Sequence, residues 1–137
     1  MSDASDFNTR VIEEFRANGG QVTGPMAGLP LLLVHHKGRK TGAERVNPVA
    51  YQSIGDHFAI FASKAGGPTS PDWYHNLVAS PDTVVEVGGE TIPVRARVAA
   101  GGEREGIWSR QKQTVPVFAE YEQRTSRQIP VVILERR

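Results

Sequence analysis

Six short apolar segments, most of them bounded by glycine or proline, constrain the fold of this chain more than any other feature. Apolar or alternating runs between turn residues are typical of β-strands. The Gly88-Gly89 pair separates two alternating segments, which is a strong signal for a hairpin. Because short turns join most of the segments, the sheet should be mainly antiparallel. We predict strands at residues 31–36, 46–51, 57–62, 83–87, 90–98 and 129–135, with Pro48 at an edge or bulge and the last strand in the centre.

Helices are predicted around these strands. Residues 7–18 carry apolar side chains on one helical face, and Gly19 and Gly20 end that helix. Ser70 is a favourable N-cap, and Pro71 a favourable first residue, for a short helix over residues 71–79. Two further helices are expected at 102–113 and 115–123, with a break near Pro116. Six strands with helices at their edges predict an α+β fold built on a small closed or half-closed barrel.

The composition fits one domain and excludes several kinds of chemistry. A chain of 137 residues supplies one core, so we expect a single domain over 1–137, in which residues 1–30 form a helix and a loop. A net charge of +1 gives no indication of a nucleic-acid partner. The absence of cysteine excludes disulfides, zinc–thiolate sites and thiol catalysis. The polar N-terminus and the short longest apolar run, 29–34, predict a cytoplasmic protein without an integral membrane segment.

A basic turn at residues 37–45 (KGRKTGAER) is the first candidate binding segment. Four cations lie between two predicted strands, and two glycines and Thr41 accompany them. Exposed N–H groups and cations on one turn suit a phosphate or a polycarboxylate tail. The spacing does not match a P-loop. A solvated hairpin tip without a ligand is an equally good interpretation of this segment alone.

The second candidate segment, residues 61–76 (FASKAGGPTSPDWYHN), runs from a strand through a glycine-rich loop to a helix. It directs backbone donors, the Lys64 ammonium and a positive helix end toward one point. The small residues at its start would let a flat ring lie against the backbone, Trp73 and Tyr74 could pack on that ring, and Asn76 could hydrogen-bond it. A plain connection with core aromatics is the alternative. No GxGxxG motif occurs, so a nicotinamide site of the Rossmann type is not expected.

The histidines do not form a metal-binding pattern. His35 and His36 are adjacent, so on a strand their side chains point to opposite faces. His57 and His75 have no partner at a ligand spacing, and no HExxH motif is present. We therefore expect no metal site.

Three blocks together resemble the deazaflavin-dependent nitroreductase and quinone reductase family: KGRKTGAERVNPVAY, FASKAGGPTSPDWYHNL and YEQRTSRQIPVVILE. With their spacing they cover most of residues 31–136. The resemblance implies a split β-barrel like that of FMN-binding proteins. It also implies coenzyme F-420, an 8-hydroxy-5-deazaflavin, as cofactor. Members of the family pass a hydride from reduced coenzyme F-420 to quinones, nitroaromatics or related conjugated acceptors.

The resemblance also implies roles for individual residues. The phosphate and oligoglutamate tail of the cofactor would be held by Lys40, Thr41 and Arg45. Pro48 would shape the floor beneath the ring, and Trp73 and Asn76 would fix the adjacent loop and helix. The residues expected to line the ring and the phosphate are Phe61, Ala62, Ser63 and Lys64.

The acceptor side departs from the nitro-reducing relatives, which tend to carry tyrosines at three-residue spacing before the last block. Here the positions are Val115, Phe118 and Tyr121, so one hydroxyl remains. We assign catalytic roles to Tyr121, as a phenol that can orient an acceptor, and to Phe118, as an apolar wall. Trp108, at helical spacing from them, is expected to cover the barrel. A quinone-like or hydrophobic acceptor suits this lining better than a nitroaromatic one.

Two other functions stay open from the sequence. A split barrel could carry the cofactor, or a lipid-like ligand, without turning it over. An FMN-dependent reductase on the same fold is the other alternative, although a single phosphate needs fewer cations than residues 37–45 supply. A homodimer is compatible with the sequence, and a lipophilic acceptor would bring the protein to a membrane surface.

Overall fold

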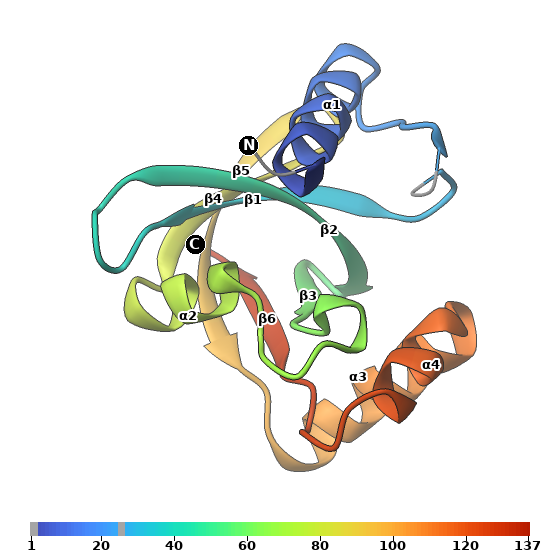
Figure 1. Ribbon diagram of the computed structural model, residues 1–137. Coiled ribbons are helices and arrows are strands. Elements are labelled where there is room, and N and C mark those ends of the chain that lie inside the picture. Colours follow the sequence, from blue (N-terminus) through green and yellow to red (C-terminus); the bar gives the residue numbers. More distant parts are fainter. Residues whose placement is uncertain (1–2, 25–26) are drawn as a thin grey trace.

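Six antiparallel strands close into a barrel in the computed structural model, which describes residues 3–24 and 27–137 (Figure 1). The order around the barrel is β1-β2-β3-β6-β5-β4. β6 pairs with β3 on one side and β5 on the other, and because the barrel is closed every strand has two neighbours. The strands are β1 (Leu31–Lys37), β2 (Glu44–Ile54), β3 (His57–Phe61), β4 (Asp82–Val87), β5 (Glu90–Val98) and β6 (Val131–Arg136).

β2 is longer than predicted, and its two halves have different neighbours. All of β1 pairs with the stretch that begins at Glu44, whereas β3 pairs with β2 only from Tyr51 onward. Pro48 pairs with Leu33 of β1 and lies in the half of β2 that β3 does not reach. Its missing N–H therefore costs no ladder bond on that side, as expected for an edge position.

Side chains are buried on both faces of several strands, which explains why those strands are apolar almost throughout. Leu32, Ile60 and Leu134 point into the barrel and form one core. Leu31 and Leu33 alternate with them and pack outside the barrel with residues of α1 (Asp3–Ala17). The opposite outer surface is covered by α3 (Gly101–Thr114) and α4 (Val117–Gln123). This second outer core, here called the α3 core, contains Ala59, Phe61, Ala99, Ile107, Trp108, Phe118, Ile129, Val131 and Ile133.

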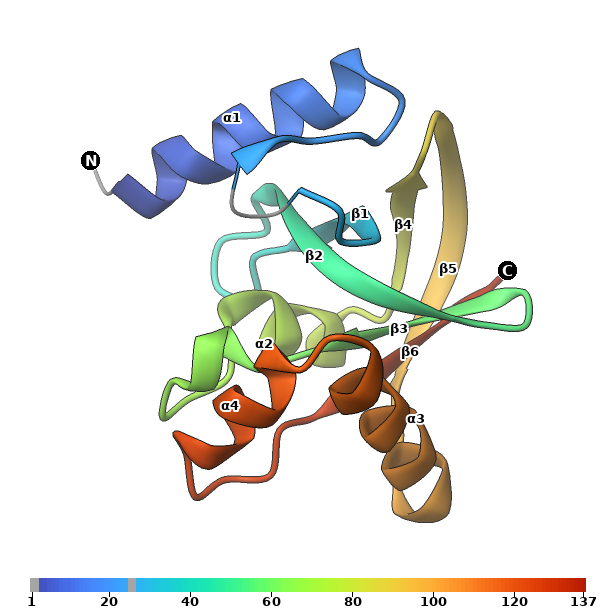
Figure 2. The ribbon, with the colours of Figure 1, turned by 90° about the vertical axis from the view of Figure 1, so that its right-hand side faces the viewer.

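The helices occupy separate places around the barrel (Figures 1 and 2). α1 lies on one side of it, and α3 and α4 lie together on the other. α2 (Asp72–Ala79) contributes Trp73 and Leu77 to the barrel core, so it closes one end of the barrel. The predicted break near Pro116 is confirmed, since α3 ends at Thr114 and α4 begins at Val117. No helix in the described part of the chain has the length and apolar character to cross a membrane.

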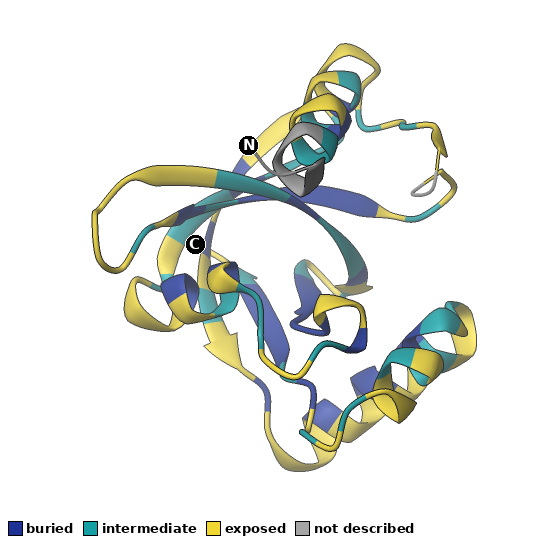
Figure 3. Cartoon of the chain, in the orientation of Figure 1, coloured by how far each residue is buried: buried dark blue, intermediate teal, exposed yellow. Residues whose placement is uncertain are grey.

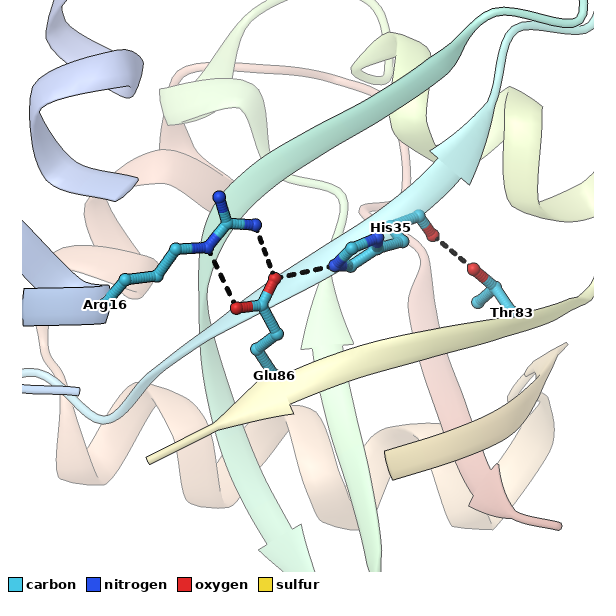
Figure 4. Close-up of polar contacts among 4 residues, drawn as sticks. All are labelled: Arg16, His35, Thr83 and Glu86. Atoms are coloured by element: carbon cyan, nitrogen blue, oxygen red, sulfur yellow. Dashed lines mark hydrogen bonds and ion pairs between the residues drawn. The ribbon is translucent and has the colours of Figure 1, made fainter. Parts of the chain in front are cut away.

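An ion-pair network joins α1 to the barrel (Figure 4). Both oxygens of Glu86 on β4 accept hydrogen bonds from the Arg16 guanidinium, at 2.7 and 3.0 Å. The same carboxylate lies 2.7 Å from Nε2 of His35 on β1. The hydrogen bond from Arg16 is the main reason that the pKa of Glu86 lies below its ordinary value. His35 thus faces α1, while its neighbour His36 is buried on the other face of β1.

The N-terminus of α2 differs from the prediction. Pro71, in an extended conformation, occupies the N-cap position, and no side chain caps the helix. Ser70 was predicted for that role, but its Oγ instead accepts a hydrogen bond from Arg127 at 3.2 Å. Because Pro71 is itself extended, with a ψ of 158°, the helix starts at Asp72, one residue further along the chain than predicted.

Candidate functional site

A groove runs from the tip of the β1–β2 hairpin toward α1. A cavity of about 220 Å³ lies at the hairpin tip, and a cavity of about 660 Å³ continues beside it. Both are lined by Arg45 and Asp72, so we treat them as one feature, the basic groove. Its hairpin end is lined by Gly38, Arg39, Lys40, Thr41 and Asn76. The wider part is lined by Asn8, Thr9, Ile12, His36, Val46, Asn47, Lys64, Pro71 and Trp73.

The hairpin tip is a tight turn that leaves its cations in solvent (Figure 3). Gly38 N–H donates to the Ala43 carbonyl at 2.8 Å, and Gly42 N–H donates to the Gly38 carbonyl at 2.7 Å. Gly42 has a φ of 73°, a conformation in which a side chain would be strained. Thr41 Oγ1 accepts from the Ala43 N–H, so the hydroxyl supports the turn. The turn thereby presents Lys40 and Arg45 as exposed side chains.

Lys40 and Arg45 have no acidic partner in the described chain, in contrast to the cations that form ion pairs elsewhere on the barrel. Across residues 3–24 and 27–137, the arginines that form ion pairs are Arg16, Arg95, Arg97 and Arg104. Lys40 and Arg45 form none there. A cluster of unpaired cations repels itself in the absence of an anion. The hairpin end of the groove is therefore suited to an anionic ligand.

Asn76 anchors the hairpin to α2. Its Oδ1 accepts hydrogen bonds from the main-chain N–H of Arg39 at 3.1 Å and from the Arg39 guanidinium at 3.2 Å. Because Oδ1 is the acceptor, the Nδ2 amide is the donor to Nδ1 of His36 at 2.9 Å. His36 then carries its proton on Nε2 and donates to Asn47 at 2.7 Å. Asn76 is engaged on both sides, so it fixes the hairpin against α2, and its hydrogen bond to a ligand ring stays a prediction.

The imidazole of His36 is suited to this role only when neutral. Burial is the main reason that the pKa of His36 lies below its ordinary value of 6.5, and the nearby Arg45 lowers it further. A protonated ring would turn Nδ1 into a donor facing the Asn76 amide. The neutral form of His36 therefore holds the link between β1, β2 and α2 in place.

The loop after β3 has an unusual backbone. Lys64, Ala65 and Gly66, which form the short helix η2 (Lys64–Gly66), all have positive φ, at 47°, 53° and 80°. A left-handed conformation costs roughly 1–2 kcal/mol for each residue with a side chain. Such strain persists only where the surroundings enforce it, and it is frequent at ligand sites.

Two contacts hold η2 from the α4 side. A Cβ at Gly66 would lie 2.8 Å from Arg124 Cβ and 2.9 Å from the Tyr121 carbonyl oxygen, so the end of α4 sits directly against the loop. Arg127 lies just beyond α4, and its guanidinium donates to the carbonyls of Ala62, Ser63, Gly67 and Thr69 and to the Ser70 hydroxyl, at 3.0–3.2 Å. Arg127 was not predicted as a site residue. No sequence pattern indicates it, because its partners are main-chain carbonyls.

Comparison with known proteins decides the family. The family model described as F420H(2)-dependent quinone reductase matches residues 8–136. The chain belongs to the F420H(2)-dependent quinone reductase family.

An F420H(2)-dependent quinone reductase of Mycobacterium tuberculosis is 37% identical over 127 residues, which cover 90% of this chain and 85% of the relative. A solved structure titled as an F420-H2 dependent reductase is 37% identical, with a TM-score of 0.71 over 77% of this chain and 94% of that chain. A second one, titled as a domain-swapped dimer, is 34% identical, with a TM-score of 0.73 over 97% of this chain and 98% of that chain.

The expectations of an F420-dependent reductase and of a split barrel are therefore confirmed. The alternatives of an FMN-dependent reductase and of a non-catalytic binding module are not favoured. Less similar solved structures share the fold, among them one titled as a pyridoxamine 5'-phosphate oxidase at 9% identity and a TM-score of 0.55. At that identity the likeness concerns the fold alone.

Within this family's barrel, the predicted ring-lining residues take different positions. Ala62 and Ser63 are buried at the start of the loop, and Ala62 belongs to the barrel core. Phe61 points the opposite way, into the α3 core. Trp73 lines the basic groove with one part of its side chain and packs in the barrel core with the rest. Pro48 pairs with Leu33 and so lies on the α1 side of β2.

Phe118 and Tyr121 lie on α4, away from the hairpin. Phe118 is 6% exposed and stacks edge-on against Phe61, with ring centroids 5.5 Å apart, and against Trp108, at 6.1 Å. Phe118 is therefore a packing residue of the α3 core. An acceptor could contact it as an apolar wall only by entering that core. Tyr121 is half-buried and contacts the Phe118 ring at 5.3 Å. As predicted, Trp108 covers the barrel.

The residues of the groove fit coenzyme F-420. An elongated ligand with a phosphate and a polyanionic tail needs cations at more than one place, and Lys40 and Arg45 lie at the hairpin end while Lys64 lies in the wider part. The Asp72 carboxylate is the exception, since it lines both parts and would repel such a tail.

Proposed function

We propose that the chain binds coenzyme F-420 along the basic groove and uses it to reduce a quinone-class acceptor. The observation that carries this proposal is the set of unpaired cations, Lys40 and Arg45, in a groove that continues to Lys64. When bound, the reduced deazaflavin supplies a hydride from its C5 atom. Lys40 and Arg45 would hold the tail, and Lys64 the phosphate. Thr41 supports the turn from which the two cations project.

The remaining site residues would orient the ring of the coenzyme and shield it from water. Ala62 and Ser63 lie beside the ring, where their small side chains permit a close approach of the backbone. Trp73 and Ile12 wall the wide part of the groove and exclude water from it. Exclusion of water strengthens every charge interaction in the site. Pro48 would stiffen the half of β2 that pairs with β1 alone and that contributes Arg45, Val46 and Asn47 to the groove.

On the acceptor side, Tyr121 would donate a hydrogen bond to the acceptor, and Phe118 would back it with apolar surface. One hydroxyl, where relatives that reduce nitro groups tend to have three, favours a quinone-class acceptor over a nitroaromatic one. General acid assistance of this kind contributes about 10²–10⁴-fold. Tyr121→Phe is therefore expected to slow quinone reduction and to leave coenzyme affinity within about twofold. The two are measured by single-turnover oxidation of the reduced coenzyme and by fluorescence titration.

The choice of acceptor is tested by comparing a naphthoquinone with a nitroaromatic compound as oxidants of the reduced coenzyme. Quinone reduction should be the faster by at least about tenfold. Faster reduction of the nitroaromatic by the wild-type chain would overturn the assignment of a quinone. A loss of coenzyme binding alone in Tyr121→Phe would instead place Tyr121 in the packing of α4.

We also propose that the chain forms a homodimer. A relative that matches 97% of the chain is titled as a domain-swapped dimer. Val78 and Val98, which are 58% and 45% exposed, flank one apolar hollow between α2 and β5 that a second copy could cover. Sedimentation should give twice the monomer mass, and Val78→Asp should shift the protein toward the monomer.

A further inference from the structure

We infer that Arg127 is a positioning residue that turns the η2 loop into a set of N–H donors for the phosphate of the coenzyme. This inference rests on the proposed function, since it assigns donors to one part of that ligand. The loop enters at Ala62 and leaves at Ser70, and Arg127 is bonded to both limbs.

The guanidinium spans the loop with its planar set of donors. Nε donates to the Gly67 carbonyl, Nη1 to the Ser70 hydroxyl, and Nη2 is shared among the carbonyls of Ala62, Ser63 and Thr69. Arginine has five N–H groups in a fixed fork and no acceptor, so it can gather several carbonyls at one point. A lysine ammonium has three donors at one atom and cannot reach both limbs in the same plane.

Peptide geometry determines where the N–H groups of the loop point when its carbonyls are bonded to Arg127. In a trans peptide, the C=O of one residue and the N–H of the next point in opposite directions, and the described chain contains no cis peptide. The carbonyls of Ala62, Ser63 and Thr69 face Arg127, so the N–H groups of Ser63, Lys64 and Ser70 face away from it. The Gly67 carbonyl has no such counterpart, because Pro68 lacks an N–H.

The loop borders the groove. Lys64 lies in the loop, Pro71 directly follows it, and both line the wide part of the groove. None of the three N–H groups, of Ser63, Lys64 and Ser70, donates to another main-chain group in the described structure. Successive N–H groups in a turn with positive φ form a concave anion site. The left-handed conformations of Lys64 and Ala65, which side chains rarely adopt, are the cost of this orientation.

Two variants test the role of Arg127. Arg127→Met removes the fork, and Arg110→Met removes an equal charge from an exposed position on α3. The probes are oxidised coenzyme F-420 and the corresponding deazaflavin alcohol, which lacks the phosphate and the tail. Arg127→Met should weaken coenzyme binding by roughly tenfold or more and change the affinity for the alcohol by less than about twofold. Arg110→Met should change neither affinity.

Equal weakening for both probes, or none for the coenzyme, would overturn the inference. If Arg127→Met does not fold, Arg127→Lys serves in the same comparison, because it keeps the charge without the planar fork. Arg127→Lys should also bind the coenzyme more weakly than the wild-type chain does.

A second readout separates this inference from the proposed function. Amide shifts of Ser63, Lys64 and Ser70 are followed by NMR while inorganic phosphate is added to the wild-type chain. These amides should shift together in the wild type and not in Arg127→Lys. Failure of the wild type to bind the coenzyme would contradict the proposed function alone. Amides that do not respond to phosphate would contradict the inference, whatever the coenzyme does.

Discussion

The β1–β2 hairpin and the η2 loop both present cations to one groove, but they are held in different ways. The hairpin is anchored from its side by Asn76, which accepts hydrogen bonds from the main chain and the guanidinium of Arg39. Its cations remain exposed and form no ion pairs in the described chain. The loop is held from behind by a cation, Arg127, and its own backbone is strained. The hairpin therefore supplies positive charges for an anionic ligand, whereas the loop supplies N–H groups in a fixed orientation.

The largest expected effect comes from removing the hairpin charges. Lys40→Ala and Arg45→Ala should each weaken coenzyme binding by about tenfold or more, because a hydrogen bond to a charged group contributes about 1.5–3 kcal/mol. The melting temperature should hardly change, since neither side chain has an ion-pair partner in the structure. Added salt should weaken binding to the wild type more than to either variant.

As a control, Asp72→Asn should change coenzyme affinity in the opposite direction from Lys40→Ala and Arg45→Ala. It removes a negative charge from the same groove and should tighten coenzyme binding by a few fold. If Asp72→Asn weakens binding, or if Lys40→Ala has no effect, the hairpin does not act through charge.

Breaking the hairpin anchor should affect stability as well as binding. Asn76→Ala leaves the buried Nδ1 of His36 without its donor and frees the Arg39 main chain. An unsatisfied buried polar group costs about 1–3 kcal/mol, so urea denaturation should show a loss of that order. Coenzyme affinity should fall in parallel. An Asn76→Ala protein with wild-type stability and weak binding would instead mean that Asn76 touches the ligand.

The same anchor should make stability depend on pH. The folded pKa of His36 is depressed by burial, so the unfolded chain takes up a proton at a pH where the folded chain does not. The stability contributed by neutral His36 is present above 6.5 and is lost as pH falls through the lower folded pKa. Denaturation of wild type and His36→Gln across this range should give a flatter profile for the variant. Parallel profiles would assign the pH dependence to other groups, such as Glu86.

The smallest expected effect concerns the strain in the loop. Ala65→Gly removes the side chain from a residue with a φ of 53° and should raise the free energy of unfolding by about 1 kcal/mol or less. Coenzyme affinity should stay within about twofold, because Arg127 still fixes the carbonyls. The same substitution at the hairpin residue Ala43, whose φ is not positive, should destabilise or have no effect. Destabilisation by Ala65→Gly would show that the loop is not strained.

The two regions were predictable to different degrees. The strands and the basic hairpin follow from local patterns, because alternation, glycine and charge act over a few residues. The contacts of Arg127 join residues about sixty positions apart through main-chain carbonyls, which carry no sequence signal. For the same reason Ser70 was assigned to a helix cap.

Phe118 illustrates a second limit. Its helical spacing with Tyr121 and Trp108 was clear, but spacing cannot separate a pocket wall from a core. Only the packing of Phe118 on Phe61, a residue of another strand, places its ring in the α3 core. The family blocks, in contrast, depend on residues in fixed local order, and they identified the family correctly.

The most direct measurement is a titration of the purified chain with coenzyme F-420, FMN and NADPH at low and high salt. If the basic groove binds the phosphate and anionic tail, the coenzyme should bind at least about tenfold more tightly than FMN at low salt. That advantage should shrink at high salt, and NADPH should not bind tightly. Equal affinity for FMN and the coenzyme, unchanged by salt, would contradict a role for the hairpin cations in recognising the tail.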